Sequence, residues 1–168
     1  MTANAQDTST AEDKPKAKRA SGFQPSLKGR ALRLLSLREH SRQELERKLK
    51  PFEETPGELA EALDFLQAKD FINEQRVVES VVNSRSRKLG ASRVRQELQA
   101  KGLPAEAIAE AVQTMRSTEL ERARDVWRKK FGEPPADANA RAKQIRFLMS
   151  RGFAAEVVKR VVAGADEL

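Results

Sequence analysis

The sequence repeats a helical pattern three times with a period of about 50 residues. Glu97-Leu98 matches Glu44-Leu45, 53 residues earlier, and Leu148 matches Leu98 after a further 50 residues. Lys101-Gly102-Leu103 likewise matches Arg151-Gly152-Phe153. A period of this length is typical of modular arrays, in which each unit contacts mainly its neighbours. The alternative is a chance coincidence of helix-capping signals. The pattern predicts an elongated array of three tandem three-helix repeats.

Each repeat is expected to consist of helices alone. The chain of 168 residues holds 39% hydrophobic, 5% aromatic and 34% charged residues, which leaves few aromatic side chains for a thick core. A helix needs only a narrow apolar stripe, and the abundant Ala, Leu, Glu, Arg, Lys and Gln favour helices. No run of Val, Thr and aromatic residues alternates as a half-buried strand would. The sequence therefore predicts an all-α fold.

Two capping signals divide the first repeat into three helices. In Ser41-Arg42-Gln43-Glu44 the Ser and the Glu can satisfy each other's backbone donors, as in a capping box. Thr55-Pro56-Gly57-Glu58 has the same pattern, with Pro at the first helical position. The apolar stripes of the three helices are then Leu32, Leu34 and Leu35; Leu45 and Leu49; and Leu59, Ala62, Leu63 and Leu66.

The second repeat divides in the same way. Asn73 is expected to cap its first helix, and Gly90 is expected to end that helix in a left-handed conformation. Gly102 ends the short second helix, and Pro104 begins the third. The apolar residues of these helices are Val77, Val78, Val81 and Val82; Val94 and Leu98; and Ala107, Ile108, Ala111 and Val112.

The third repeat begins at Thr118-Glu119-Leu120-Glu121 and breaks at Gly132-Glu133-Pro134-Pro135. Trp127 shares helical spacing with Val126 and Phe131, so we expect it in the core rather than as a base-stacking platform. Gly152 is expected to end the middle helix. Apolar residues of the two remaining helices are Ile145 and Leu148, and Val157, Val158, Val161 and Val162.

The chain before the first repeat has a different composition. Residues 1–26 mix Thr, Ser, Ala, Pro and charged residues without apolar periodicity, which predicts a disordered tail. The predicted domains are this tail at 1–26, the first repeat at 27–70, the second at 71–116 and the third at 117–168.

The inventory of reactive side chains argues against an enzyme. Nucleophilic catalysis and common metal sites need His or Cys, but the chain has one His, no Cys and no Tyr. We expect His40 to be an exposed residue at a helix entry. The eight glycines are scattered, with no Gly-x-Gly that would cradle a phosphate. The sequence predicts no catalytic residues, no metal and no cofactor.

Charge is the remaining functional signal. The net charge of +7 attracts acidic partners, such as nucleic acid or an acidic protein surface. Residues 83–101 and 141–160 each hold six basic residues and one acidic residue, whereas residues 50–80 hold three basic and eight acidic residues. We therefore select contact residues from the two basic stretches: Arg85, Arg87, Lys88, Arg93, Arg95 and Lys101 first, then Arg146 and Arg151.

Two long motifs resemble the RecX family of regulatory proteins, which modulate the RecA recombinase. The first is ALRLLSLREHSRQELERKL at 31–49, and the second is FINEQRVVESVVNSRSRKLGASRVRQELQAKGL at 71–103. The resemblance covers about residues 29–163. Family members commonly have Phe-Ala where this chain has Val77-Val78, a difference that affects a core contact. The third repeat matches the family least closely.

The resemblance implies a non-enzymatic protein that binds the RecA filament on single-stranded DNA and restrains its ATP hydrolysis, strand exchange and co-protease activity. The basic repeats would contact DNA within the filament, and other surfaces would contact RecA. We expect a cytoplasmic monomer that is not bound to a membrane. A stand-alone DNA-binding regulator with helix-turn-helix repeats remains an alternative, as does a helical adaptor with another partner. A DNA-only binder would lose affinity steeply with salt and would ignore RecA.

Overall fold

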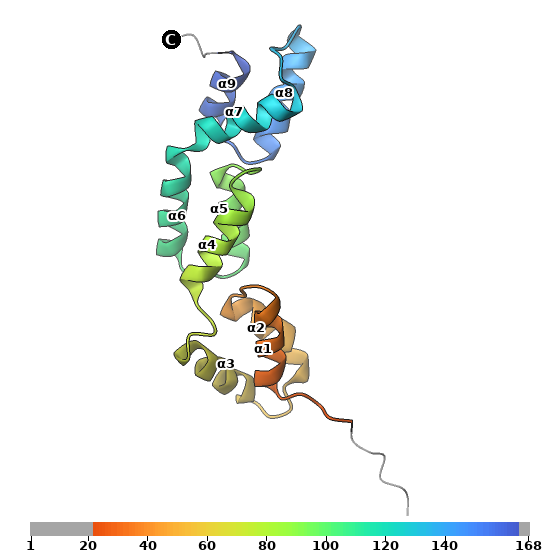
Figure 1. Ribbon diagram of the computed structural model, residues 1–168, viewed down its shortest axis with the longest axis vertical. Coiled ribbons are helices and arrows are strands. Elements are labelled where there is room, and N and C mark those ends of the chain that lie inside the picture. The colour runs from red at the N-terminus through yellow and green to blue at the C-terminus, as the bar shows by residue number, and fades with distance from the viewer. Residues whose placement is uncertain (1–21, 165–168) are drawn as a thin grey trace, which may run out of the picture.

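The computed structural model describes residues 22–164, within which all regular structure is helical, as predicted. Most of the predicted tail, residues 1–21, lies outside the described residues, as do residues 165–168. The elements follow one another along an elongated body (Figure 1). They are α1 (Leu27–Leu37), α2 (Arg42–Leu49), the 3-10 helix η1 (Lys50–Phe52), α3 (Glu58–Ala68), α4 (Glu74–Arg85), α5 (Ala91–Ala100), α6 (Ala105–Ser117), α7 (Glu119–Lys130), α8 (Ala138–Ser150) and α9 (Ala155–Val162).

Three separate hydrophobic cores run along this body, one for each group of three helices. The first lies among α1, α2 and α3 and also takes in Ile72, and the second lies among α4, α5 and α6. The third lies among α7, α8 and α9, where Trp127 packs as predicted and donates from Nε1 to Oε1 of Gln144 at 2.8 Å. The predicted array of three-helix repeats is confirmed, and we call these groups the first, second and third repeats.

The first capping box is confirmed, but the second prediction was wrong. Ser41 Oγ accepts from the backbone N–H of Glu44 at 3.1 Å, and Glu44 Oε2 accepts from that of Ser41 at 2.9 Å. At α3 the N-cap is Gly57, whose φ of +90° turns the chain so that Glu53 Oε1 accepts from the N–H of Gly57 at 3.0 Å and of Leu59 at 3.2 Å. The Thr55 side chain therefore caps nothing. Its backbone carbonyl accepts from Glu58 instead.

The predicted role of Gly90 was also wrong. Helix α4 ends earlier, at Arg85, and Gly90 is the N-cap of α5 with an ordinary extended backbone, φ −77° and ψ 166°. A glycine is needed there because the chain approaches Gly152 so closely that a Cβ atom on Gly90 would overlap its carbonyl group. Gly102 and Gly152 do end their helices in the left-handed region, with φ of +71° and +85°.

The structure also changes which residues of the first two repeats correspond to each other. Ser41 and Gly90 are both N-caps of second helices and lie 49 residues apart, so Leu45 corresponds to Val94 rather than to Leu98. The predicted spacing of 53 residues is one helical turn longer. Leu45 and Leu49 are both buried, and a shift of four residues keeps the same helix face inward. Hydrophobic spacing alone does not separate the two registers.

His40 is buried, with an exposed fraction of 3%, and the predicted exposed position was wrong. The second repeat covers the loop that carries it, because Glu39 Oε1 pairs with Arg76 Nε at 2.9 Å and Ser41 Oγ donates to the carbonyl of Lys101 at 2.6 Å. Burial lowers the pKa of His40, opposed by the hydrogen bond between its Nδ1 and the carbonyl of Arg38. A neutral imidazole fits this position.

Candidate nucleic-acid interface

The first and second repeats meet at a polar joint around Glu44. Its Oε1 accepts from Lys101 Nζ at 2.9 Å and from Arg38 Nη2 at 3.0 Å. Burial alone would raise the pKa of Glu44, but the hydrogen bonds from Arg38, the Ser41 backbone and Lys101 outweigh it and hold the pKa at about 2. Lys101, selected from the sequence as a contact residue, is thus held by a carboxylate within the chain.

The second and third repeats meet through backbone atoms at the corresponding positions. The N–H of Gly90 donates to the carbonyl of Arg151 at 2.8 Å, and that of Ser92 donates to Gly152 at 3.3 Å. In both joints the N-cap of one second helix donates a hydrogen bond to the carbonyl of the basic residue that ends the next second helix. The repeated contact fixes how each repeat follows the one before.

Arg122 of α7 ties the loop after α4 to the third repeat. Its Nη1 donates to the carbonyls of Ser86 at 2.8 Å and Leu89 at 2.7 Å, and its Nη2 donates to that of Met115 at 2.9 Å. Burial lowers the pKa of Arg122, opposed by the nearby Glu119 carboxylate, which itself accepts from the N–H of Ala91 at 2.8 Å. The loop that carries Arg87 and Lys88 is therefore held beside α7.

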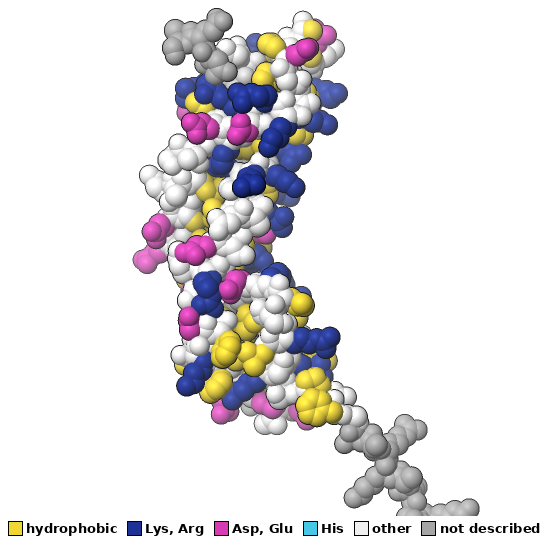
Figure 2. All heavy atoms as spheres, in the orientation of Figure 1, with side chains coloured by type: hydrophobic (Ala, Val, Ile, Leu, Met, Phe, Trp, Pro, Cys, Tyr) yellow, Lys and Arg dark blue, Asp and Glu magenta, His cyan; other side chains and the backbone are white. Residues whose placement is uncertain are grey.

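This second joint creates a hollow of about 500 Å³ whose charged lining is entirely basic. Because Arg87 and Lys88 lie in the loop after α4 of the second repeat, whereas Lys129 and Lys130 end α7 of the third, the groove draws on both repeats. Figure 2 shows Lys and Arg side chains gathered along one side of the second and third repeats. We call this hollow the basic groove; its lining consists of Arg87, Lys88, Lys129, Lys130 and Arg151 together with Val126 and Phe147.

Phe147 is the aromatic residue that lines the basic groove. Its ring meets that of Phe131 edge to face, with centroids 5.3 Å apart. The guanidinium carbon of Arg151 lies 4.5 Å from the Phe147 centroid, and Lys130 Nζ lies 5.9 Å from it. Cations held over an aromatic face keep their outer donors free for a ligand. The arrangement suits successive anionic groups, such as the phosphates of a nucleic acid strand.

The structure brings together only part of the predicted contact set. Arg87, Lys88 and Arg151 line the basic groove. Arg93 and Arg146 are exposed outside its lining. Two others are engaged elsewhere, since Arg85 Nε pairs with Glu97 at 3.0 Å and Lys101 pairs with Glu44. Arg95 lines a different hollow, of about 400 Å³, with Gln99, Leu103, Ala105, Ile108 and Ala109.

Sequence reasoning missed Lys129 and Lys130. A signal was present, because Arg128-Lys129-Lys130 is a run of three basic residues in the last turn of a helix. Such a run also complements the negative end of the helix dipole, so it has an ordinary structural explanation. Only the fold places its last two members opposite Arg87 and Lys88.

The described part of the chain holds neither a carboxylate or histidine cluster for a metal ion nor a membrane-spanning helix. Among residues 22–164, no group of three or more His, Cys, Asp or Glu side chains is placed to hold a metal ion. None of the helices described is long and apolar enough to cross a bilayer.

Family models of the three RecX domains match almost the whole described chain. The first three-helix domain of RecX matches residues 28–66, the second matches 73–112 and the third matches 117–162. Each match falls on one of the three helical repeats.

Individual relatives agree with the family models. The chain is 54% identical over 143 residues to the regulatory protein RecX of Leptothrix cholodnii, covering 85% of this chain and 91% of that protein. It is 48% identical to RecX of Ralstonia pickettii, covering 85% and 90%. The crystal structure of RecX from Lactobacillus salivarius has the same fold, with a TM-score of 0.71 at 22% identity over 84% of this chain and 96% of that one. The chain belongs to the RecX family.

Proposed function

We propose that this protein binds the RecA filament on single-stranded DNA and restrains its ATP hydrolysis, strand exchange and co-protease activity. It would thereby regulate recombination and DNA repair, in the cytoplasm and as a monomer. The basic groove contacts the phosphates of the strand within the filament. The observation that carries this proposal is the groove itself, because five basic residues and no acidic residue line one hollow between two repeats of an elongated array.

The shape of the molecule supports a filament as the partner. An array of unlike repeats presents an extended surface, which suits a continuous helical partner better than a short palindromic site. The basic groove lies at a joint, so a strand that occupies it contacts the second and third repeats together. Binding there also makes the relative placement of the repeats important for function.

A stand-alone DNA-binding regulator is the second candidate, favoured by the same groove. Its affinity for DNA would fall steeply with salt and would not depend on RecA. A filament modulator would need RecA on the strand for tight association.

The deciding experiment measures ATP hydrolysis by RecA on single-stranded DNA as this protein is added. Inhibition at ratios well below one molecule per RecA, unchanged by a large excess of free DNA, supports direct action on the filament. Inhibition that appears only near saturation of the DNA, and that excess DNA removes, supports competition for the strand.

A charge-matched pair of variants ties the result to the basic groove. Lys129→Glu with Lys130→Glu reverses two groove charges, whereas Lys159→Glu with Arg160→Glu reverses two exposed charges on α9 outside its lining. The proposal expects the first variant to lose inhibition and the second to keep it. Equal behaviour of the two variants contradicts the assignment of the basic groove.

A further inference from the structure

The first repeat carries a second hollow, of about 310 Å³, far from the basic groove. Its walls come from α1, the C-terminal end of α2 and η1. Apolar and basic residues line it, and no acidic residue does; we call Arg30, Arg33 and Lys48 its basic rim. We call it the first-repeat groove; its lining consists of Leu34, Leu37, Leu49 and Phe52 with Arg30, Arg33, Lys48, Pro25 and Gly29.

Large apolar side chains in this groove remain in contact with water. Leu37 is 77% exposed and Phe52 is 47% exposed, in a chain of which 34% of the residues are charged. Apolar and basic side chains lie side by side on the first repeat in Figure 2. An exposed apolar patch with a polar rim is typical of a site that binds a protein.

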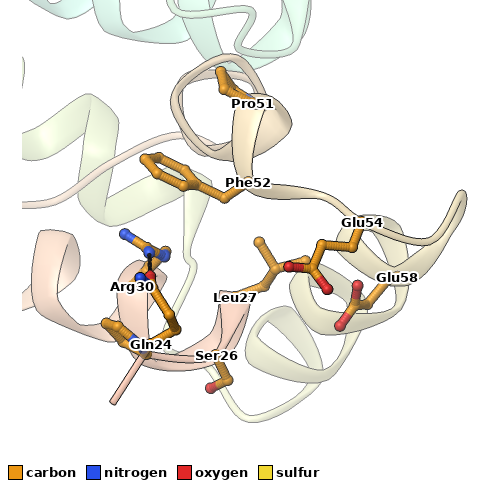
Figure 3. Close-up of a pocket in the computed structure, with 9 residues that line it drawn as sticks. Gln24, Ser26, Leu27, Arg30, Pro51, Phe52, Glu54 and Glu58 are labelled. Carbon is orange, nitrogen blue, oxygen red and sulfur yellow. Dashed lines mark hydrogen bonds between the residues drawn. The ribbon is translucent and has the colours of Figure 1, made fainter. Parts of the chain in front are cut away.

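The aromatic side of the groove is already ordered. The guanidinium of Arg30 lies 3.9 Å from the centroid of the Phe52 ring, and its Nη2 donates to Gln24 at 3.0 Å. Figure 3 shows this pair beside an adjoining pocket, in which Glu54 and Glu58 lie on the other side from Phe52 and Arg30. Of these two pockets, only the adjoining one is lined by acidic side chains, whereas the first-repeat groove is lined by basic ones.

The rim cations are available to a partner. Neither Arg33 nor Lys48 forms an ion pair within residues 22–164, and both are exposed. Helix α1 contains three basic residues and no acidic residue. The joint with the second repeat uses the opposite end of α2, where Ser41 lies, so the rest of the chain leaves the groove open.

We propose that the first-repeat groove docks an acidic segment of a partner protein through bulky apolar side chains. The apolar side chains of the segment would pack on Leu37 and Phe52, and its carboxylates would pair with Arg33 and Lys48. This recognition combines apolar anchors with opposite charges, as in other peptide grooves. It adds a second interaction surface to the proposed function and does not depend on it.

Two other occupants fit the groove poorly. Residues 1–21 of the chain contain four basic and three acidic residues, and Met1 is their only large apolar side chain, so they offer no anchor and no complementary charge. A second copy that placed the same groove against this one would bring two basic rims together. An acidic partner segment meets neither objection.

The test uses the full-length protein and a fluorescein-labelled peptide of about ten residues, in which Leu and Phe anchors alternate with Asp and Glu. Fluorescence anisotropy measures binding. Leu37→Glu is expected to weaken binding at least about tenfold. Leu32→Glu makes the same change on the same helix, at a side chain 37% exposed outside the groove lining, and is expected to leave binding unchanged. Arg33→Glu with Lys48→Glu is expected to weaken binding comparably.

Several results overturn the proposal. They are no binding by the wild-type protein, equal binding of a peptide whose anchors are all Ala, and equal effects of Leu37→Glu and Leu32→Glu. Sedimentation velocity tests whether a second copy of the chain occupies the groove. A wild-type dimer that Leu37→Glu dissociates would assign the groove to that second copy. Circular dichroism of each variant confirms that the helices remain. Because RecA is absent, the outcome is independent of the ATP-hydrolysis experiment.

Discussion

The backbone N–H of Gly90 donates a 2.8 Å hydrogen bond to the carbonyl oxygen of Arg151, which joins the N-terminus of α5 to the C-terminal end of α8. Through this bond the second repeat positions the residue whose guanidinium covers Phe147 in the basic groove. The close approach that the bond requires leaves no room for a Cβ atom on Gly90. Packing at one glycine therefore controls the shape of a charged surface built from α7, the C-terminal end of α8 and the loop after α4.

Replacing Gly90 by Ala is expected to open this joint, because the new methyl group overlaps the backbone of Gly152. Overpacking of this kind costs about 1–3 kcal/mol of unfolding free energy. Urea unfolding measures the loss, and small-angle X-ray scattering measures the change in molecular dimensions. Gly22→Ala is the control, since a Cβ atom there has no atom within 4 Å. Unchanged stability and dimensions in Gly90→Ala would show that the joint accommodates the added methyl group without loss of unfolding free energy.

The Glu44 carboxylate is expected to make the first joint sensitive to acid. Its pKa falls from 4.5 to about 2 in the folded protein, so the carboxylate stabilises the folded state above pH 4.5. That contribution is lost as the pH falls from about 4.5 toward 2, because protonation then removes the charge that Lys101 and Arg38 contact.

Glu44→Gln tests this expectation. At pH 7 it should lower the free energy of unfolding by about 1–3 kcal/mol, because Gln carries no charge and its NH2 group replaces one of the two oxygens that accept from Arg38, Lys101 and the Ser41 N–H. Below pH 4.5 the difference from wild type should shrink. Urea unfolding at a series of pH values gives both results. Glu46→Gln, at a side chain 48% exposed, should cost little at any pH. A difference between Glu44→Gln and wild type that is constant with pH would contradict the assignment.

The two lysines of α7 should contribute directly to the salt dependence of binding. Each phosphate contact with single-stranded nucleic acid adds about 0.7 to the slope of log affinity against log salt. Lys129→Ala with Lys130→Ala is expected to reduce that slope by about 1.4, if both lysines contact phosphates. Anisotropy of a labelled oligothymidine at several salt concentrations measures it. Lys159→Ala with Arg160→Ala should leave the slope unchanged, and equal slopes in both variants would place the strand elsewhere.

The sequence predicts the all-helical array well because each helix carries its own short-range signals. Ser41 with Glu44 forms the expected capping box, and Gly102 and Gly152 end helices as expected. These signals depend on neighbours three or four residues away along the chain. Three separate cores, each formed by helices adjacent in sequence, keep the larger arrangement local as well.

Contacts between repeats are what the sequence does not reveal. Gly90 matches the sequence pattern of a glycine that ends a helix. A glycine is needed there because the backbone of Gly152, 62 residues away, lies too close for a Cβ atom. Lys101 has the charge of a contact residue, but Glu44, in another repeat, neutralises it. Lys129 and Lys130 supply two of the five basic residues of the groove. A helix dipole explains these two lysines equally well until the fold places them opposite Arg87 and Lys88.

Arg122 is expected to be the strongest single support of the second joint. Its guanidinium donates to three backbone carbonyls, two in the loop after α4 and one at the end of α6. Lys at this position keeps the charge but does not reproduce the planar fork that reaches several carbonyls at once. Arg122→Lys should therefore lower the unfolding free energy by about 1–3 kcal/mol and speed hydrogen exchange at the amides of residues 86–92. Arg116→Lys, at an exposed position of α6, is the matched control.

Because the same loop carries Arg87 and Lys88, Arg122→Lys should also weaken oligothymidine binding although no groove residue has changed. Protected amides together with weakened binding would mean that the Arg122 guanidinium contacts the strand itself and does not act through the loop.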